Sequence, residues 1–388
     1  MSVYLDHAAT TPMLPSVLTA YISALGLVGN PSSIHSQGQQ AKRMLEEARE
    51  QVAASLGADS VEVTFTSGGT EAINLAVKGL FWARQGRSSL SRPRILVSRA
   101  EHHATIDAVE WLEQHEGAVI DWVPVSSTGL IDLDYVAAAL ADDVALVTVL
   151  WANNEVGTIQ PVAALVALAE AHGVPVHCDA VSAYGHVPID FHATGLAALS
   201  VSAHKVGGPV GIGALLIARS ATITPLIHGG NQQRARSGTQ DAAGAVAFGV
   251  AASLIEQAPA AATLRDHLIA AVLEAVPSAV LRGDPVDRLA NNAHFTFPGC
   301  EGDSLLFLLD VAGFSVSTGS ACQAGVPEAS HALLAMGIPE ADARGALRIT
   351  LGPGTTLEEV DAFVAALPAA VERARAAGYS DRETVLGH

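Results

Sequence analysis

Short apolar runs alternate with longer amphipathic stretches through the middle of the chain. Six runs are continuous in their apolar character, which is typical of strands buried on both faces: Val61–Thr66, Ile95–Ser98, Ala145–Trp151, Val174–Asp179, Ala198–Ser202 and Gly213–Ala218. The stretches between them have a helical period: Thr70–Trp82, His103–Glu116, Asp134–Leu140 and Val162–His172. This alternation predicts an α/β fold with a mainly parallel sheet, which binds ligands at the carboxyl ends of its strands.

The pattern changes after about residue 256, where helices and isolated short strands follow one another. The predicted elements are a helix over Ala260–Val276, strands over Ala293–Phe297, Phe314–Ser317 and Arg348–Leu351, and helices over Gly302–Val311 and Leu357–Ala377. This region predicts a smaller α+β domain. We therefore expect a large domain over residues 16–255 and a small domain formed by residues 1–15 and 256–388.

Composition narrows the class of protein. A chain of 388 residues with 49% hydrophobic residues suits a large domain plus a smaller one. The net charge of -18 argues against direct binding to nucleic acid. Three cysteines without a CxxC pair predict neither a disulfide framework nor a structural zinc site, and no other metal site is expected.

Nothing in the sequence resembles a targeting or membrane segment. The first residues lack the pattern of a signal peptide. The most apolar candidate for a membrane helix, Pro15–Val28, is interrupted by Ser16, Thr19 and Ser23. We therefore expect a soluble cytoplasmic protein that does not bind membranes.

A glycine-rich turn follows the first predicted strand. The sequence Ser67-Gly68-Gly69-Thr70-Glu71 leads into a helix, whose first turn presents free backbone N–H groups. Such a turn can bind a phosphate with help from the Thr70 hydroxyl; the alternative is a tight turn with Thr70 as the helix N-cap. It is neither a Walker A loop nor a GxGxxG motif, so a nucleoside triphosphate or NAD is not favoured.

Lys205 is distinguished from the other two lysines by its position. Lys42 and Lys78 fall in predicted helices, whereas Lys205 follows a strand and precedes a Gly-rich turn. Ligands bind at such a place, and lysine is the residue that forms Schiff bases. The alternative is an exposed loop lysine. Its neighbours Ser202 and His204 are candidate contacts to a phosphate or a ring.

Asp179 ends the predicted strand that begins at Val174. A buried carboxylate needs a partner, and the protonated nitrogen of a pyridine ring would provide one. A Schiff-base lysine together with such an aspartate is what a pyridoxal-phosphate site requires. The alternative role is a helix N-cap. Asn154, in the turn after another strand, could bond a phenolic oxygen of the cofactor, and Cys178 is expected to be packed in the interior.

Two further residues could act on a substrate. Cys322 lies in a loop of small residues, where a thiolate can be exposed enough to act as a nucleophile; the alternative is a loop thiol without a role. Cys300 lacks comparable surroundings and is predicted to be structural. Arg348 lies among apolar residues and needs a partner, either the carboxylate of a substrate or a structural ion pair.

The order and spacing of these signals resemble the cysteine desulfurases, in the class V aminotransferase family of fold type I pyridoxal-phosphate enzymes. The resemblance extends nearly from end to end, and the cysteine loop is its most discriminating mark, because relatives with other reactions lack it. The matching segments are Tyr4–Pro12, Ser67–Glu71, Glu101–His103, Asn153–Gly157, Ala203–Lys205, Arg236–Thr239, Ser320–Cys322 and Leu347–Gly352.

The resemblance implies a removal of sulfur from L-cysteine that yields L-alanine. Lys205 would bind pyridoxal 5′-phosphate covalently and act as the base, Arg348 would bind the substrate carboxylate, and Cys322 would take the sulfur as a persulfide. The remaining implied roles concern the cofactor: stacking for His102, the ring nitrogen for Asp179, the phenolic oxygen and the substrate for Asn154, the phosphate for Gly69, Thr70, Ser202 and His204, and the phosphate of the neighbouring subunit for Thr239. The last role implies a homodimer.

The length of the cysteine loop resembles the subgroup that supplies sulfur to scaffold and carrier proteins. The implied partner is therefore a sulfur-acceptor or iron–sulfur scaffold protein, for cluster assembly or tRNA thiolation. One departure affects the site, because Ser182 stands where the family has a Gln that shares the contact to the cofactor oxygen. The alternatives are a selenocysteine lyase, a class V aminotransferase, and a non-catalytic sulfur-delivery subunit.

Overall fold

The computed structural model of the chain describes residues 2–85, 92–230, 232–255, 259–319 and 329–378. Within them, strands gather in a seven-stranded sheet, a three-stranded sheet and a two-stranded pair. The large sheet has the order β2-β8-β7-β6-β5-β3-β4, with bounds Val63–Thr66, Gly213–Ile217, Ala198–Ser202, Val176–Asp179, Val144–Leu150, Arg94–Ser98 and Val119–Val123. Only β8 runs antiparallel to its neighbours, so the predicted α/β fold with a mainly parallel sheet is confirmed.

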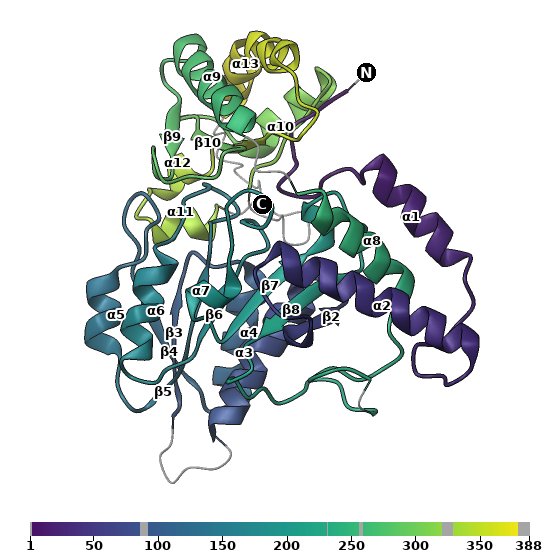
Figure 1. The fold of residues 1–388 in the computed structure, drawn as a ribbon. Helices are drawn as coiled ribbons and strands as arrows, with labels where there is room; N and C mark the ends of the chain where they lie inside the picture. The colour runs from purple at the N-terminus through teal and green to yellow at the C-terminus, as the bar shows by residue number, and fades with distance from the viewer. Residues whose placement is uncertain (1, 86–91, 231, 256–258, 320–328, 379–388) are drawn as a thin grey trace, which may run out of the picture.

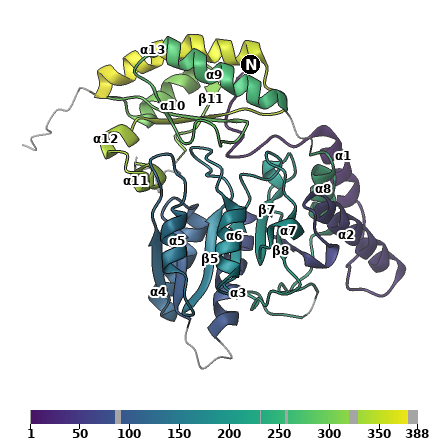
Figure 2. The same cartoon turned by 60° about the vertical axis from the view of Figure 1, so that its left-hand side comes forward.

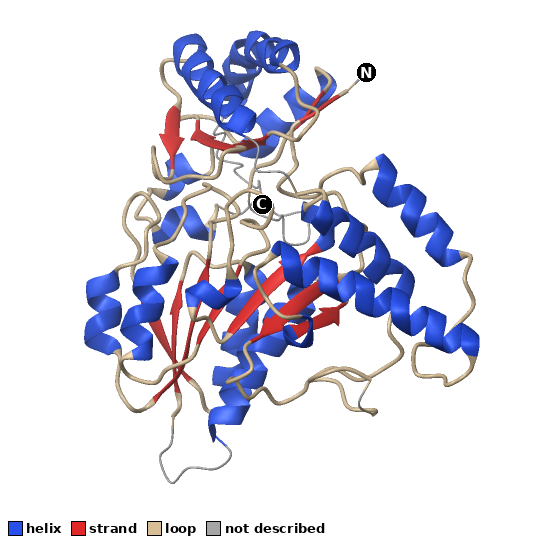
Figure 3. Ribbon diagram, in the orientation of Figure 1, coloured by secondary structure: helices blue, strands red, loops and turns tan. Residues whose placement is uncertain are grey.

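Helices cover both faces of the large sheet (Figures 1 and 3). The period of two along each strand divides its apolar side chains between them: in β3, Leu96 packs on one face while Ile95 and Val97 pack on the other. The face of Ile95 is covered by α3 (Gly69–Gln85) and α4 (His103–Glu116). The opposite face is covered by α2 (Ser36–Ser55), α5 (Leu133–Ala139), α6 (Val162–Glu170), α7 (Phe191–Thr194) and α8 (Ala242–Ser253).

A second layer of structure lies above the carboxyl ends of the large sheet (Figure 2). Its antiparallel sheet has the order β12-β10-β9, with bounds Ala346–Thr350, Asn292–Thr296 and Val280–Arg282. This sheet packs into a separate apolar core with α9 (Pro259–Ala275), α10 (Gly302–Val311) and α13 (Leu357–Gly378). Two short helices, α11 (His331–Ala335) and α12 (Glu340–Ala343), lie between this core and the large sheet.

The beginning of the chain joins the second layer. The strand β1 (Val3–Tyr4) pairs in parallel with β11 (Phe314–Ser315), and Leu5 lies in the core of the small sheet. The chain then crosses to α1 (Pro15–Leu25), which contacts α8. The predicted boundary at residue 255 falls directly before residues 256–258, outside the described residues, so the domain limits stay a prediction.

The sequence pattern located most elements within a few residues. The helix α4 has the predicted bounds because the His102 ring accepts a hydrogen bond from the Ala104 amide at its start, and Gly117, with φ of 71°, ends it in a left-handed turn. The edge strand β4 was not predicted, since Asp121 interrupts its apolar character. Among the helices of the described residues, none is long and apolar enough to cross a membrane.

Candidate active site

Lys205 lies directly after β7, at the end of a short 3-10 helix (Ala203–Lys205). Its ammonium group donates to the carbonyl oxygens of Ala8 and, at 3.0 Å, of Ala9. Burial and, to a smaller extent, the positive charge of Arg348 lower the pKa of Lys205 to about 8. A lysine with this pKa has a substantial neutral fraction near neutral pH, so it can act as a nucleophile or as a base.

Asp179 ends β6 and is almost completely buried, with 2% of its surface exposed. Its Oδ1 accepts a hydrogen bond from the Val181 amide at 2.9 Å, and in the described part of the chain no cation lies within ion-pair distance of it. Burial raises its pKa to about 6, against the lowering effect of Lys205. The residues that follow form turns, so the helix N-cap alternative is wrong.

Two histidines flank this pair. His102 directly precedes α4 and lines a cavity together with Lys205 and Asp179. Its removal from water, followed by the nearby charge of Lys205, lowers its pKa to about 4. The same two causes lower the pKa of His204 to about 4. The Nδ1 of His204 lies 3.3 Å from the hydroxyl of Thr10. Both rings are therefore neutral at neutral pH, and a neutral ring can stack on a cationic pyridine without charge repulsion.

The glycine-rich turn after β2 opens α3, as predicted. The helix begins at Gly69, so Thr70 lies inside its first turn and is not the N-cap. Thr70 is exposed and faces the same cavity as Lys205. Glu71 in this turn accepts hydrogen bonds from the Ser67 amide at 2.7 Å and from Arg236 at 2.9 Å. The first amides of a helix have no partner within it, and Gly69 and Thr70 line the same cavity as Lys205, so an anion can bind at this helix start.

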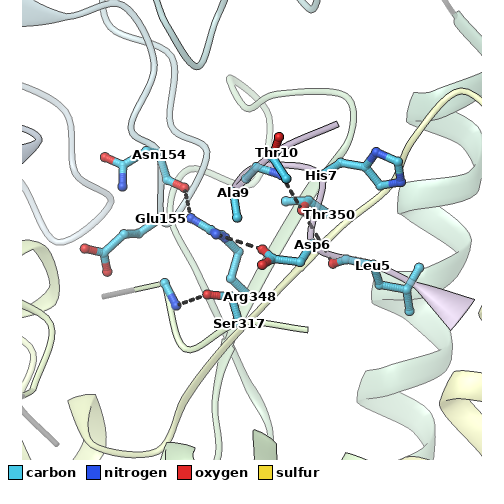
Figure 4. Close-up of polar contacts among 12 residues, drawn as sticks. Leu5, Asp6, His7, Ala9, Thr10, Asn154, Glu155, Ser317, Arg348 and Thr350 are labelled. Atoms are coloured by element: carbon cyan, nitrogen blue, oxygen red, sulfur yellow. Dashed lines mark hydrogen bonds and ion pairs between the residues drawn. The ribbon is translucent and has the colours of Figure 1, made fainter. Parts of the chain in front are cut away.

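Arg348 enters the cavity from the small sheet (Figure 4). Its Nη2 forms an ion pair with Oδ1 of Asp6 at 2.9 Å, and its Nη1 donates to the carbonyl oxygen of Asn154 at 2.7 Å. The ion-pair alternative is therefore confirmed. Arg348 nonetheless lines the cavity and has N–H donors beyond these two contacts, so the structure is compatible with both of the partners that the sequence left open.

These residues surround one cavity of about 360 Å³. From the predicted site, it is lined by Gly69, Thr70, His102, Asn154, Asp179, Ser182, His204, Lys205 and Arg348. Ser202 and Thr239 do not line it, although the sequence predicts them as part of the site. Ser202 is buried beside Gly69, Thr239 is exposed on the segment that Arg236 ties to Glu71, and Cys322 lies outside the described residues. The predicted burial of Cys178 and Cys300 is confirmed.

Sequence reasoning missed two acidic residues at this cavity. Asp6, the partner of Arg348, was noted only as part of a matching segment. Glu101 is buried behind the cavity, where its Oε1 accepts a hydrogen bond from the Leu150 amide at 3.1 Å and its Oε2 has no partner among the described residues. Burial, together with the nearby Asp179, raises the pKa of Glu101 well above its usual value. Its position directly before His102 was the only signal in the sequence.

Comparisons with known proteins identify the family of the chain. A family model described as Aminotransferase class-V matches residues 3–363. The IscS-like cysteine desulfurase of Mycobacterium tuberculosis is 51% identical over 384 residues, which cover 96% of this chain and 97% of that protein. A solved structure named NIFS-LIKE PROTEIN has a TM-score of 0.88 and 34% identity, covering 96% of this chain and 100% of that chain.

A solved structure of SspA in complex with cysteine is also similar, with a TM-score of 0.80 and 32% identity over 92% of this chain and 100% of that chain. Enzymes of this family depend in general on pyridoxal phosphate, and cysteine desulfurases act on L-cysteine. The family model matches most of the chain, and the identity to these relatives points to the same family. The chain belongs to the class V aminotransferase family and, within it, to the cysteine desulfurases.

Proposed function

We propose that this chain binds pyridoxal 5′-phosphate in the cavity around Lys205 and removes sulfur from L-cysteine, with Cys322 as the sulfur acceptor. The observation that carries the proposal is the convergence of Lys205, Asp179 and Arg348 on one cavity of about 360 Å³. A nucleophilic amine, a buried carboxylate and a guanidinium suit an aldehyde, a pyridine nitrogen and a substrate carboxylate, respectively.

The residues present fit this cofactor. Asp179 is a buried carboxyl group without a cationic partner among the described residues, and a protonated ring nitrogen would compensate it. The amides at the start of α3, with Thr70, would hold the phosphate, and the close approach of this turn to Val181 requires a glycine, since a Cβ at Gly69 would lie 2.7 Å from Cγ2 of Val181. His102 would stack on the ring, and Asn154 would contact its phenolic oxygen.

The cofactor, when bound, supplies the electron sink that acidifies the Cα–H bond of the amino acid. Lys205 takes the Cα proton, which its lowered pKa allows near neutral pH. Arg348 binds the carboxylate of the substrate. The Cys322 thiolate attacks the substrate sulfur, the carbon–sulfur bond breaks, and sulfur remains on Cys322 as a persulfide. Proton return to carbon completes L-alanine.

The proposal extends to partners. A persulfide needs an acceptor, so the enzyme would deliver sulfur to a carrier or iron–sulfur scaffold protein. We also propose a homodimer in which Thr239 reaches the neighbouring subunit. Support for this comes from the exposure of Thr239 on a segment that the Arg236–Glu71 ion pair fixes next to the start of α3.

The test is incubation of the cofactor-loaded protein with L-cysteine and a reductant, while alanine, sulfide and visible absorbance are followed together. Cys322→Ala should abolish sulfide and alanine formation but keep the cofactor absorbance. Cys300→Ala is the matched control, because Cys300 is buried in the small-sheet core, and it should keep both activities. Normal sulfide release by Cys322→Ala would refute the nucleophile. Amino-group transfer to an oxoacid, or activity with selenocysteine alone, would favour the related enzymes instead.

A further inference from the structure

The segment Leu5–Thr11 lies across the cavity and is bonded to both layers of the molecule. On the small-sheet side, the Thr350 amide donates to the Leu5 carbonyl at 2.8 Å, and the Ala8 amide donates to the Thr350 hydroxyl at 2.9 Å. On the large-sheet side, the Thr11 amide donates to the His204 carbonyl at 2.9 Å. The position of Asp6 is therefore fixed by its neighbours on both sides.

The Asp6 carboxylate points at Arg348 (Figure 4). Asp6 forms a parallel bridge with Thr350 of β12. Arg348 lies two residues before Thr350, so the side chains of Arg348 and Asp6 lie on the same face of the sheet. The Tyr4 hydroxyl donates to the Asp6 carbonyl at 3.1 Å and holds its backbone from the other side. In contrast to a surface ion pair between two flexible side chains, this pair is largely buried, with 6% of the Arg348 side chain and 19% of the Asp6 side chain exposed.

The guanidinium of Arg348 is held at two points. A guanidinium has five N–H donors, and here one bonds to Asp6 and one to the Asn154 carbonyl. The buried Nε–H has no partner among the described residues. Two fixed contacts on different nitrogens define the plane of the group and leave other donors for a ligand. A donor held in place in advance loses less conformational freedom when it binds a carboxylate.

We propose that Asp6 is a positioning residue, which fixes the Arg348 guanidinium in the orientation that binds the carboxylate of the amino-acid substrate. The inference rests on the proposed function, because it requires a substrate carboxylate at Arg348. Asp6 does not touch the reacting atoms. Its effect reaches the substrate only through Arg348, and it therefore acts on binding far more than on the bond-breaking steps.

Two substitutions separate the charge of Asp6 from its position. Asp6→Asn keeps an oxygen that can accept the Arg348 hydrogen bond but removes the negative charge, whereas Asp6→Ala removes both. We expect Asp6→Ala to raise the KM for L-cysteine by about tenfold or more, the size of one lost oriented ionic contact, with kcat changed by less than about threefold. Asp6→Asn should lie between Asp6→Ala and the unmodified enzyme.

Cysteamine binding distinguishes a loss of carboxylate binding from a general structural effect, because a structural effect would weaken the binding of cysteamine as well. Cysteamine is cysteine without the carboxylate, so its binding to the loaded enzyme, followed by cofactor absorbance, should change by less than about twofold in both variants. Asp121→Asn is the matched control, since Asp121 pairs with Arg94 at 2.9 Å on the far edge of the large sheet. It should leave the KM unchanged.

Arg348→Ala distinguishes failure of the inference from failure of the proposed function. A higher KM for cysteine in Arg348→Ala but not in Asp6→Ala would overturn the positioning role alone. An unchanged KM in Arg348→Ala would refute the substrate contact on which the inference rests. A lower KM in either Asp6 variant would also overturn the inference, because it would mean that Asp6 competes with the substrate. Equal losses for cysteine and cysteamine would show a general structural effect.

Discussion

The two walls of the cavity differ in whether their charged groups are paired. The wall from the large sheet carries Lys205 and Asp179, which form no ion pair within 4 Å in the described residues, and burial shifts both pKa values toward the neutral forms. The wall from the small sheet carries Arg348, whose charge is balanced by Asp6 at 2.9 Å. Groups on the first wall can change protonation near neutral pH, while the second wall presents a fixed charge. In the proposed mechanism, this difference separates proton transfer from carboxylate binding in space.

Removal of the amine on the first wall should have the largest effect. Lys205→Ala deletes both the covalent link to the cofactor and the base, so we expect activity to fall by at least about 10³-fold. Alanine formation and the visible absorbance of the bound cofactor measure the two losses. Lys78→Ala is the control, since Lys78 lies over the Trp111 ring, 4.3 Å from its centre and away from the cavity. Comparable losses in both variants would contradict the assignment.

Asp179→Asn should come next, with a loss of activity of about 10²-fold, because the neutral amide no longer stabilises a protonated ring nitrogen. Without cofactor, the same change should stabilise the protein. The pKa of Asp179 is raised to about 6, so the unmodified protein loses stability as pH rises from about 4 through 6, and the loss is complete above that range. Near pH 8 we expect Asp179→Asn to be roughly 2 to 3 kcal/mol more stable to urea.

The gain in Asp179→Asn should shrink as pH falls toward 4, because the aspartate is then protonated in both the folded and unfolded states. An equal gain at all pH values would mean that a change in packing, and not the charge, explains it. Asp121→Asn serves again as the control, since it loses an ion pair and should not be stabilised.

The pH dependence of cofactor attachment tests how the two walls interact. Only the neutral amine attacks an aldehyde, so attachment of pyridoxal phosphate to the cofactor-free protein should accelerate with pH and reach half its maximum rate near pH 8, instead of near 10.5. The Arg348 charge contributes to this lowered pKa, so Arg348→Met should move the midpoint upward by a fraction of a unit. Stopped-flow absorbance measures the midpoint, and a downward shift would contradict the coupling.

The smallest effect is expected at Ser182. It lines the cavity close to Asp179, where the family has a Gln. Ser182→Gln should shift the absorbance maximum of the bound cofactor and change kcat by less than about threefold, because a single neutral hydrogen bond contributes only about 1 kcal/mol. Ser182→Ala is the control and should leave the spectrum nearly unchanged. A change in kcat above tenfold would mean that Ser182 has a direct part in the reaction.

The first wall could be predicted from the sequence, and the second only in part. Lys205 and Asp179 each follow an apolar strand, and parallel strands end at the same edge of a sheet, so a local pattern places them together. The partner of Arg348 could not be found in this way, since Asp6 lies 342 residues away and no periodicity links them. The edge strand β4 was missed because Asp121 interrupts its apolar residues, as an edge strand allows. The surroundings of Cys322 lie outside the described residues.

The bonds that join Leu5–Thr11 to β12 bear on how the protein is made. Asp6 is synthesised long before Arg348, which follows it by 342 residues. The strands of the large sheet lie between them in the sequence, so these strands can pair while synthesis continues. Contacts between such distant residues form slowly. If the proposed function is right, the nascent polypeptide completes the edge that carries Lys205 and Asp179 before it completes the place for the amino-acid carboxylate.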